Sequence, residues 1–199
     1  MQTSVHLREV QRVKDFLRMM QADLLVGGRR PGVYLAGGAV RTLLTNEPVV
    51  DYDLFFDSEE SANAIEQFLH AQKGAIETYR CPAGQLITIQ VRMFKIQLIK
   101  KTYHPNIEDL MDRFDFTICK FGLDLGTGLM TYSMRDEEDL FNKILRINNL
   151  QYPVATLHRV QKYIAKGYKP EDWQEFWSDV LTRSQNIELT EENLALYID

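Results

Sequence analysis

A buried strand that ends in two glycines, with an Asp-x-Asp strand close behind it, constrains this chain more than any other feature. Residues 33–36 (Val-Tyr-Leu-Ala) form a short apolar run, which predicts a buried strand. Gly37 and Gly38 follow it. Because glycine lacks a Cβ, the backbone can turn sharply there and approach a ligand closely. Residues 39–44 then predict the first turns of a helix, whose free N–H groups and positive dipole end can bind an anion.

Two aspartates lie in the next apolar run, residues 49–56. Asp51 and Asp53 are two positions apart, so on a strand their side chains project from the same face. Neighbouring carboxylates repel each other unless a cation lies between them. Together with Arg41, this pattern predicts a triphosphate-binding turn that faces a divalent metal site. Each part also has a simpler interpretation, in which Gly-Gly is only a turn and Asp51 is a solvated loop residue.

Composition excludes some classes of function. The chain has 199 residues and a formal net charge of −5, which argues against strong unaided binding to nucleic acid, although a local basic patch is compatible with it. No apolar run approaches the ~20 residues that a membrane helix needs. The first ten residues lack the pattern of a signal peptide. Cys81 and Cys119 have no metal-ligand spacing, so we expect reduced thiols in a cytoplasmic protein.

Hydrophobic periodicity divides the chain into a mixed α/β region, residues 1–148, and a helical region, residues 149–199. The patterns predict strands at 75–79, 86–91, 94–99 and 129–134. They predict helices at 4–25, 58–72, 107–111 and 154–165, another that begins at Pro170, and a last one from Thr190 to about Tyr197.

Three blocks of sequence resemble motifs of one family, the head domain of the poly(A) polymerase and CCA-adding nucleotidyltransferases. The first, residues 35–44 with 51–53, has Gly-Gly, an arginine three residues after the second glycine, and a downstream Asp-x-Asp. The second, residues 109–118, resembles the family's Glu-Asp-Leu…Arg-Arg-Asp-Phe-Thr-Ile-Asn segment. The third, residues 127–146, resembles its Gly-x-Leu…Asp-Leu-x-x-Lys-x-Ile/Leu-Arg segment. The blocks follow the family's order and spacing, and the resemblance covers roughly residues 33–168.

The resemblance implies an α+β fold, with a polymerase-β-like nucleotidyltransferase palm (a small mixed sheet with flanking helices) followed by a helical neck. It also implies a metal-dependent enzyme that uses an NTP and two Mg²⁺ ions. Asp51 and Asp53 are then the implied catalytic and metal-binding residues. The residues implied to bind the nucleotide are Gly37, Gly38, Arg41, Arg113, Asp115 and Arg159.

Two of the chain's departures from the family pattern bear directly on catalysis and base choice. Gln97 stands roughly where family members have a third carboxylate, and an amide binds a hard cation more weakly and cannot act as a general base. Glu77, Asp115 or Asp124 could substitute for it. The Glu-Asp-x-x-Arg element that sets base choice in the tRNA enzymes has no match near residues 152–159. A catalytically weak or inactive module that binds nucleotide, RNA or a protein partner is therefore an alternative.

The leading hypothesis is an enzyme that transfers NMP from an NTP to a hydroxyl of RNA or another acceptor. The helix predicted over 154–165 and its continuation carry a basic face, on which Arg159, Lys162 and Lys166 could hold an RNA or tRNA acceptor. A solvated helix face explains the same charges equally well. Toxin-like transfer onto tRNA or a protein side chain is a third option, but no residue selects it. Base preference, acceptor and oligomeric state stay open.

Overall fold

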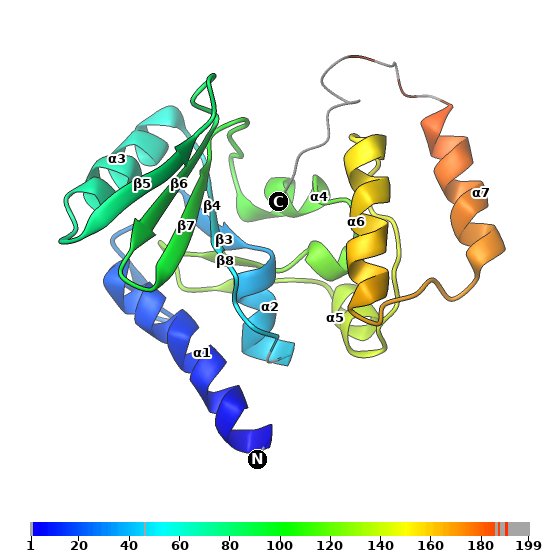
Figure 1. Ribbon diagram of the computed structural model, residues 1–199, viewed down its shortest axis with the longest axis horizontal. Helices are drawn as coiled ribbons and strands as arrows, with labels where there is room; N and C mark the ends of the chain where they lie inside the picture. The colour runs from blue at the N-terminus through cyan, green and yellow to red at the C-terminus, as the bar shows by residue number, and fades with distance from the viewer. Residues whose placement is uncertain (1, 46, 186, 188–189, 191–199) are drawn as a thin grey trace. The chain divides into compact units, whose positions relative to one another are not determined.

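The structure is a computed structural model that describes residues 2–45, 47–185, 187 and 190. The chain divides into two units (Figure 1). Unit 1 comprises Met1–Met111 and Phe121–Thr131, and unit 2 comprises Asp112–Lys120 and Tyr132–Asp199. The predicted boundary after residue 148 stays a prediction, since these units have other limits.

A seven-stranded mixed sheet is the centre of unit 1 (Figure 1). Its strand order is β5-β6-β7-β4-β3-β8-β9, in which β4 runs parallel to β7 and the other neighbours are antiparallel. The strands are β3 (Val33–Ala36), β4 (Tyr52–Phe56), β5 (Ala75–Arg80), β6 (Leu86–Val91), β7 (Phe94–Ile99), β8 (Gly122–Asp124) and β9 (Met130–Thr131). A separate two-stranded ribbon pairs β1 (Ala22–Asp23) with β2 (Gly27–Gly28).

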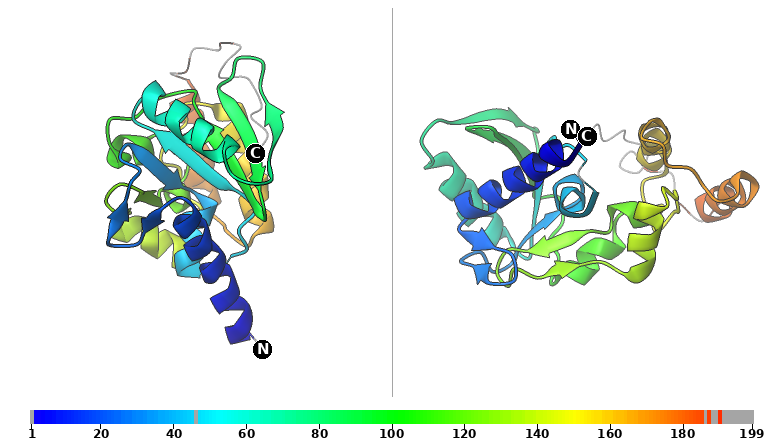
Figure 2. Two further views of the ribbon diagram at one scale, coloured as in Figure 1. Left: turned by 90° about the vertical axis from the view of Figure 1, so that its left-hand side faces the viewer. Right: turned by 90° about the horizontal axis from the view of Figure 1, so that it is seen from below.

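Helices cover the face of the sheet that carries Tyr52, Leu54 and Phe56, all of which are buried. The ring of Phe16 in α1 (Gln2–Met19) stacks on Tyr52 at 4.0 Å between centroids. On the same face, α3 (Glu59–His70) lies along β5 and β6 (Figures 1 and 2). Unit 1 also contains α2 (Gly38–Thr45), and α4 (Ile107–Asp112) ends at the first residue of unit 2. The alternation along β4 therefore places Asp53 and Phe55, both half-buried, on its second face.

Unit 2 is built from η1 (Thr117–Cys119), α5 (Met134–Phe141), α6 (Pro153–Ala165) and α7 (Trp173–Ser184). A buried carboxylate joins the first two of these elements. Asp139 of α5 is 2% exposed and accepts hydrogen bonds from Thr117 Oγ1 at 2.7 Å and from Arg146 Nε at 3.0 Å. From α6, Tyr163 packs edge-on against the rings of Phe116 and Tyr168.

The mixed α+β fold with a sheet and flanking helices is confirmed, and most predicted elements lie within a few residues of the observed ones. The first helix ends at Met19 rather than Leu25 because the backbone at Gln21 has a φ of 58° and then enters the β1–β2 ribbon. The helix predicted from Pro170 begins at Trp173, where Asp172 caps it. The last predicted helix lies, after Thr190, outside the described residues. Within the described part of the chain, no helix is long and apolar enough to cross a membrane.

Candidate active site

The glycine turn lies directly in front of one of the two predicted aspartates. Gly37 has a φ of +78°, a conformation that favours glycine. A Cβ at this position would lie 3.5 Å from Asp53 Oδ2, so the missing side chain leaves space before the carboxylate. The N–H of Gly37 donates to the carbonyl of Phe121 at 3.0 Å and is therefore already used. The amides that can face an anion are those of the first turn of α2, which begins at Gly38.

Asp51 and Asp53 occupy the polar face of the sheet. Asp53 lies within β4, and Asp51 directly precedes the strand. Both are half-buried, whereas Tyr52 between them is buried on the opposite face. Asp53 pairs in register with Ala36 on one side and with Gln97 on the other. The structure thus brings together the end of the predicted glycine strand and the predicted Asp-x-Asp pair.

Arg41 lies beneath the turn. Its side chain is buried, with Nη2 3.9 Å from Glu47 Oε2. The hydroxyl of the next residue, Thr42, donates to the carbonyls of Gly38 at 3.1 Å and Glu47 at 2.7 Å. The contacts with Glu47 join α2 to the segment that leads to β4, so the position of Arg41 suits bracing of the turn.

Two side chains near the aspartates were missed by sequence reasoning. Lys95 Nζ lies 3.7 Å from Asp51 Oδ2. The period-2 alternation of residues 94–99 could have placed Lys95 beside Gln97 on the polar face. Glu9 of α1 is 9% exposed and accepts the backbone N–H of Val49 at 3.2 Å, which fixes the segment that enters β4. No pattern in the sequence distinguishes Glu9 from its neighbours.

The predicted site residues of unit 2 form a separate group. Arg159 Nη1 donates to Asp115 Oδ2 at 3.0 Å, although the two residues are 44 positions apart. The backbone carbonyl of Asp115 also accepts the N–H groups of Asn148 and Asn149. Arg113 is exposed. On α6, Lys162 and Lys166 are exposed as well. The structure therefore brings Asp115 and Arg159 together.

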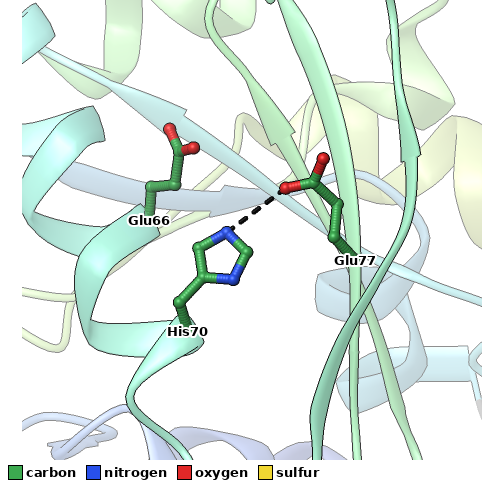
Figure 3. Close-up of side chains that lie close together, drawn as sticks. All are labelled: Glu66, His70 and Glu77. Carbon is green, nitrogen blue, oxygen red and sulfur yellow. Dashed lines mark ion pairs between the residues drawn. The ribbon is translucent and has the colours of Figure 1, made fainter.

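A further cluster of metal-ligand types lies between α3 and β5. Figure 3 shows Glu66 and His70, one helical turn apart, with His70 Nε2 3.3 Å from a carboxylate oxygen of Glu77. Arg80 Nη2 already donates to Glu66 at 2.6 Å and to Glu77 at 2.7 Å. Lys100 Nζ donates to Glu66 at 2.9 Å. The hydrogen bond from Arg80 lowers the pKa of Glu77, and these cations occupy the place that a metal ion would take.

Unit 2 also contains a cavity of about 560 Å³. Side chains of α5, α7 and the segment between α5 and α6 line it, and none of the predicted site residues is among them. Four of the charged groups in its lining pair with one another, Arg146 with Glu171 at 2.6 Å and Arg183 with Asp179 at 2.7 Å.

Comparison with known proteins identifies a family with a phage member. A family model described as "Gabija anti-defense 2 family protein" matches residues 7–143. A curated relative, "Gabija anti-defense 2" of Bacillus phage SPbetaL7, is 28% identical over 153 residues, which cover 75% of this chain and 38% of the relative. The chain thus spans well under half the length of this relative. The matched family is not the poly(A) polymerase family that the motifs resemble.

Solved structures with the same fold are a tRNA nucleotidyltransferase and CCA-adding enzymes. One is a tRNA nucleotidyltransferase complexed with a primer tRNA and an incoming ATP analog, with a TM-score of 0.57 and 17% identity over 86% of this chain and 50% of that chain. Another is the Thermotoga maritima CCA-adding enzyme complexed with tRNA, with a TM-score of 0.56 and 21% identity over 77% of this chain and 37% of that chain. At these identities the likeness shows the fold alone, which is that of a nucleotidyltransferase.

Proposed function

The chain belongs to the Gabija anti-defense 2 family, and from this premise we propose that it is a metal-dependent nucleotidyltransferase that helps a phage to counter Gabija defence. In this proposal it moves NMP from an NTP to a hydroxyl of RNA or of another acceptor. The observation that carries the proposal is the position of Gly37, whose missing Cβ opens a space 3.5 Å from the carboxylate of Asp53. We place the reaction in the cytoplasm.

The donor set at this space fits a hard divalent cation. Asp51 and Asp53 offer carboxylate oxygens from one face of the sheet, which are the ligands that Mg²⁺ prefers. When bound, Mg²⁺ would polarise the phosphoryl oxygens and neutralise charge on the departing pyrophosphate. The two-ion arrangement implied by the resemblance stays a prediction.

The protein's own groups bind and orient the reactants. The first-turn amides of α2, from Gly38 onward, would hold phosphate oxygens, because a helix leaves these N–H groups without intrahelical partners. Arg41 would keep the turn in place from below. A preset position for the triphosphate lowers the barrier, since the reacting groups are already aligned.

The groups of unit 2 are those that the motif resemblance assigns to nucleotide and acceptor binding. In this proposal Arg113, Asp115 and Arg159 approach the sugar and base. The exposed Lys162 and Lys166 would hold an RNA or tRNA backbone. Structures of the same fold are described as complexes with tRNA and an ATP analog, and this supports nucleotide and RNA as partners.

A second candidate function is binding without turnover. It is favoured by the polar face itself, because Gln97 lies in register with Asp53 where a third carboxylate is expected. Lys95 also places a positive charge 3.7 Å from Asp51. A module of this kind would hold nucleotide, RNA or a protein partner.

One experiment separates the two functions. The chain is incubated with each α-³²P-labelled NTP, Mg²⁺ or Mn²⁺ and total RNA, next to an Asp51→Asn/Asp53→Asn variant. A matched Asp15→Asn/Asp23→Asn variant removes the same charge from one half-buried and one exposed position of unit 1. We expect label transfer by the parent and the matched variant and none by Asp51→Asn/Asp53→Asn. Metal-dependent NTP binding without transfer to any acceptor would instead support the binding module.

The anti-defence role has its own test. The three proteins are expressed in host cells that carry Gabija, and plaques of a Gabija-sensitive phage are counted. We expect protection of the phage by the parent and the matched variant. Equal protection by Asp51→Asn/Asp53→Asn would mean that the aspartates are not needed for the role.

A further inference from the structure

Four side chains share the polar face where β4 and β7 run side by side. The pairing of Asp53 with Gln97 sets the register, and two residues earlier it places Asp51 beside Lys95. Paired residues of neighbouring strands project from the same face of a sheet. The face that would hold the metal therefore carries two carboxylates, one ammonium and one amide.

This donor set fits one divalent cation and does not fit two. Lys95 Nζ lies 3.7 Å from Asp51 Oδ2, so part of the negative charge of the pair is already balanced. The position in register with Asp53 offers the neutral oxygen of Gln97, a weaker ligand for Mg²⁺ than a carboxylate. On the β7 side of the aspartates, a second divalent ion would meet the ammonium group of Lys95 and the neutral side chain of Gln97.

We propose that the site binds a single divalent cation through Asp51 and Asp53, and that the ammonium of Lys95 supplies the second positive charge facing a bound polyphosphate. This inference rests on the proposed function, because it concerns the same site. Lys95 is suited to the role because its side chain is 42% exposed while the carboxylate partner is 23% exposed, so a ligand can reach the ammonium group. An ordinary surface ion pair without a role at the site is the alternative that the experiment must exclude.

The first test is a titration with Mn²⁺ alone, followed by electron paramagnetic resonance of the free ion. We expect one Mn²⁺ per parent chain, and none at this affinity in Asp51→Asn/Asp53→Asn. In Lys95→Met, Mn²⁺ should bind about tenfold more tightly, because the variant removes the screened repulsion between a divalent ion and an ammonium group about 6 Å apart. Lys73→Met removes the same charge from an exposed turn of unit 1 and should leave the affinity unchanged.

The second test rebuilds the missing ligand. Lys95→Met/Gln97→Asp replaces the ammonium by an apolar group and the amide by a carboxylate, so we expect two Mn²⁺ per chain in the presence of α,β-methylene-ATP. The parent should hold one under the same conditions. Circular dichroism and thermal melting of each variant identify any that fails to fold, and the single Lys95→Met variant keeps the proposal testable in that case.

Several outcomes would overturn the inference. They are two Mn²⁺ per parent chain with the analog, equal affinities in Lys95→Met and Lys73→Met, or weaker binding in Lys95→Met. If the inference fails while labelled NMP is still transferred, the proposed function stands without it. If one ion binds and responds to Lys95 as expected while no transfer occurs, the metal site stands and the enzymatic function fails.

Discussion

Replacing Gly37 by alanine should damage the candidate site far more than it damages the fold. Gly37 has a φ of +78°, and its Cβ would lie 3.5 Å from Asp53 Oδ2, an ordinary contact distance. The added methyl group therefore meets no clash, and its structural cost is that of the backbone conformation. Gly74 offers a close control, because its φ is +79° and a Cβ there meets nothing within 4 Å.

The loss of stability follows from this geometry. An L-residue in the left-handed region costs about 1–2 kcal/mol relative to glycine. For a chain of this size, 1 kcal/mol lowers the melting temperature by roughly 2–4 °C. Gly37→Ala and Gly74→Ala should therefore each melt about 2–8 °C below the parent, by nearly the same amount.

Ligand binding should separate the two variants. The methyl group of Gly37→Ala fills the space before the Asp53 carboxylate, so it crowds a bound ligand and should cost about 1–3 kcal/mol of binding, or roughly 5- to 150-fold in affinity. Equilibrium dialysis with each labelled NTP and Mn²⁺ measures the effect, and Gly74→Ala should bind like the parent. Equal affinities in the two variants would refute the claim that the glycine turn forms part of the nucleotide site.

Three further predictions concern stability. Glu9→Ala leaves a buried backbone N–H without its charged acceptor and should cost about 2 kcal/mol in thermal or urea unfolding. Asp139→Ala removes the buried carboxylate that accepts from Thr117 and Arg146 and should cost about 2–3 kcal/mol, since Arg146 keeps its ion pair with Glu171. Burial raises the pKa of the Glu66 carboxyl group, but hydrogen bonds from Arg80 and Lys100 outweigh this effect and hold the pKa below the usual 4.5. A carboxyl group whose pKa is lowered in the folded state stabilises the fold at pH values above its unfolded-state pKa. This stabilisation should be lost as the pH falls below about 4.5, so the free energy of unfolding of Glu66→Gln should depend less on pH in this range.

Each of these has an outcome that contradicts it. A Glu9→Ala variant that melts with the parent would mean that water replaces the carboxylate at the backbone N–H. For Asp139→Ala, a loss of less than about 1 kcal/mol in the free energy of unfolding would mean that the ion pair with Arg146 contributes no more than a solvent-exposed pair does. Parent and Glu66→Gln curves that remain parallel between pH 6 and pH 3 would show that Glu66 contributes nothing to the acid transition.

Local patterns predicted the elements of the sheet well, because each depends on nearby residues. The alternating β-formers at 86–91 and 94–99 predicted β6 and β7 with their observed bounds. Ser58 and the two glutamates after it predicted the start of α3, where the Ser58 side chain accepts the N–H of Ser61. The start of α7 was misplaced because Pro170 and Asp172 are both strong boundary signals, and only tertiary packing decides between them.

The candidate site depends on contacts between segments that are distant in the sequence, and the sequence predicts such contacts less well. The sequence predicted that Gly37 and Asp53 belong to one unit, but not that the amide of Gly37 is used by Phe121. It identified Gln97 as unusual without placing Lys95 beside Asp51, since this requires the register of β4 against β7. Positions of this kind are determined by strand pairing across more than forty residues.

The parallel pairing of β4 with β7 has a consequence for the way the chain acquires its shape. During synthesis, β5, β6 and β7 can pair as hairpins, because they are neighbours in the sequence. The central strand β4 can pair with β7 only after residues 94–99 have been synthesised, so one edge of β4 stays unpaired until then. Such non-local closure is slow compared with hairpin formation. A nascent or partly unfolded chain therefore carries the glycine turn and the acidic pair without Lys95 and Gln97 beside them, and the cation affinity of the acidic pair should change when β7 pairs with β4.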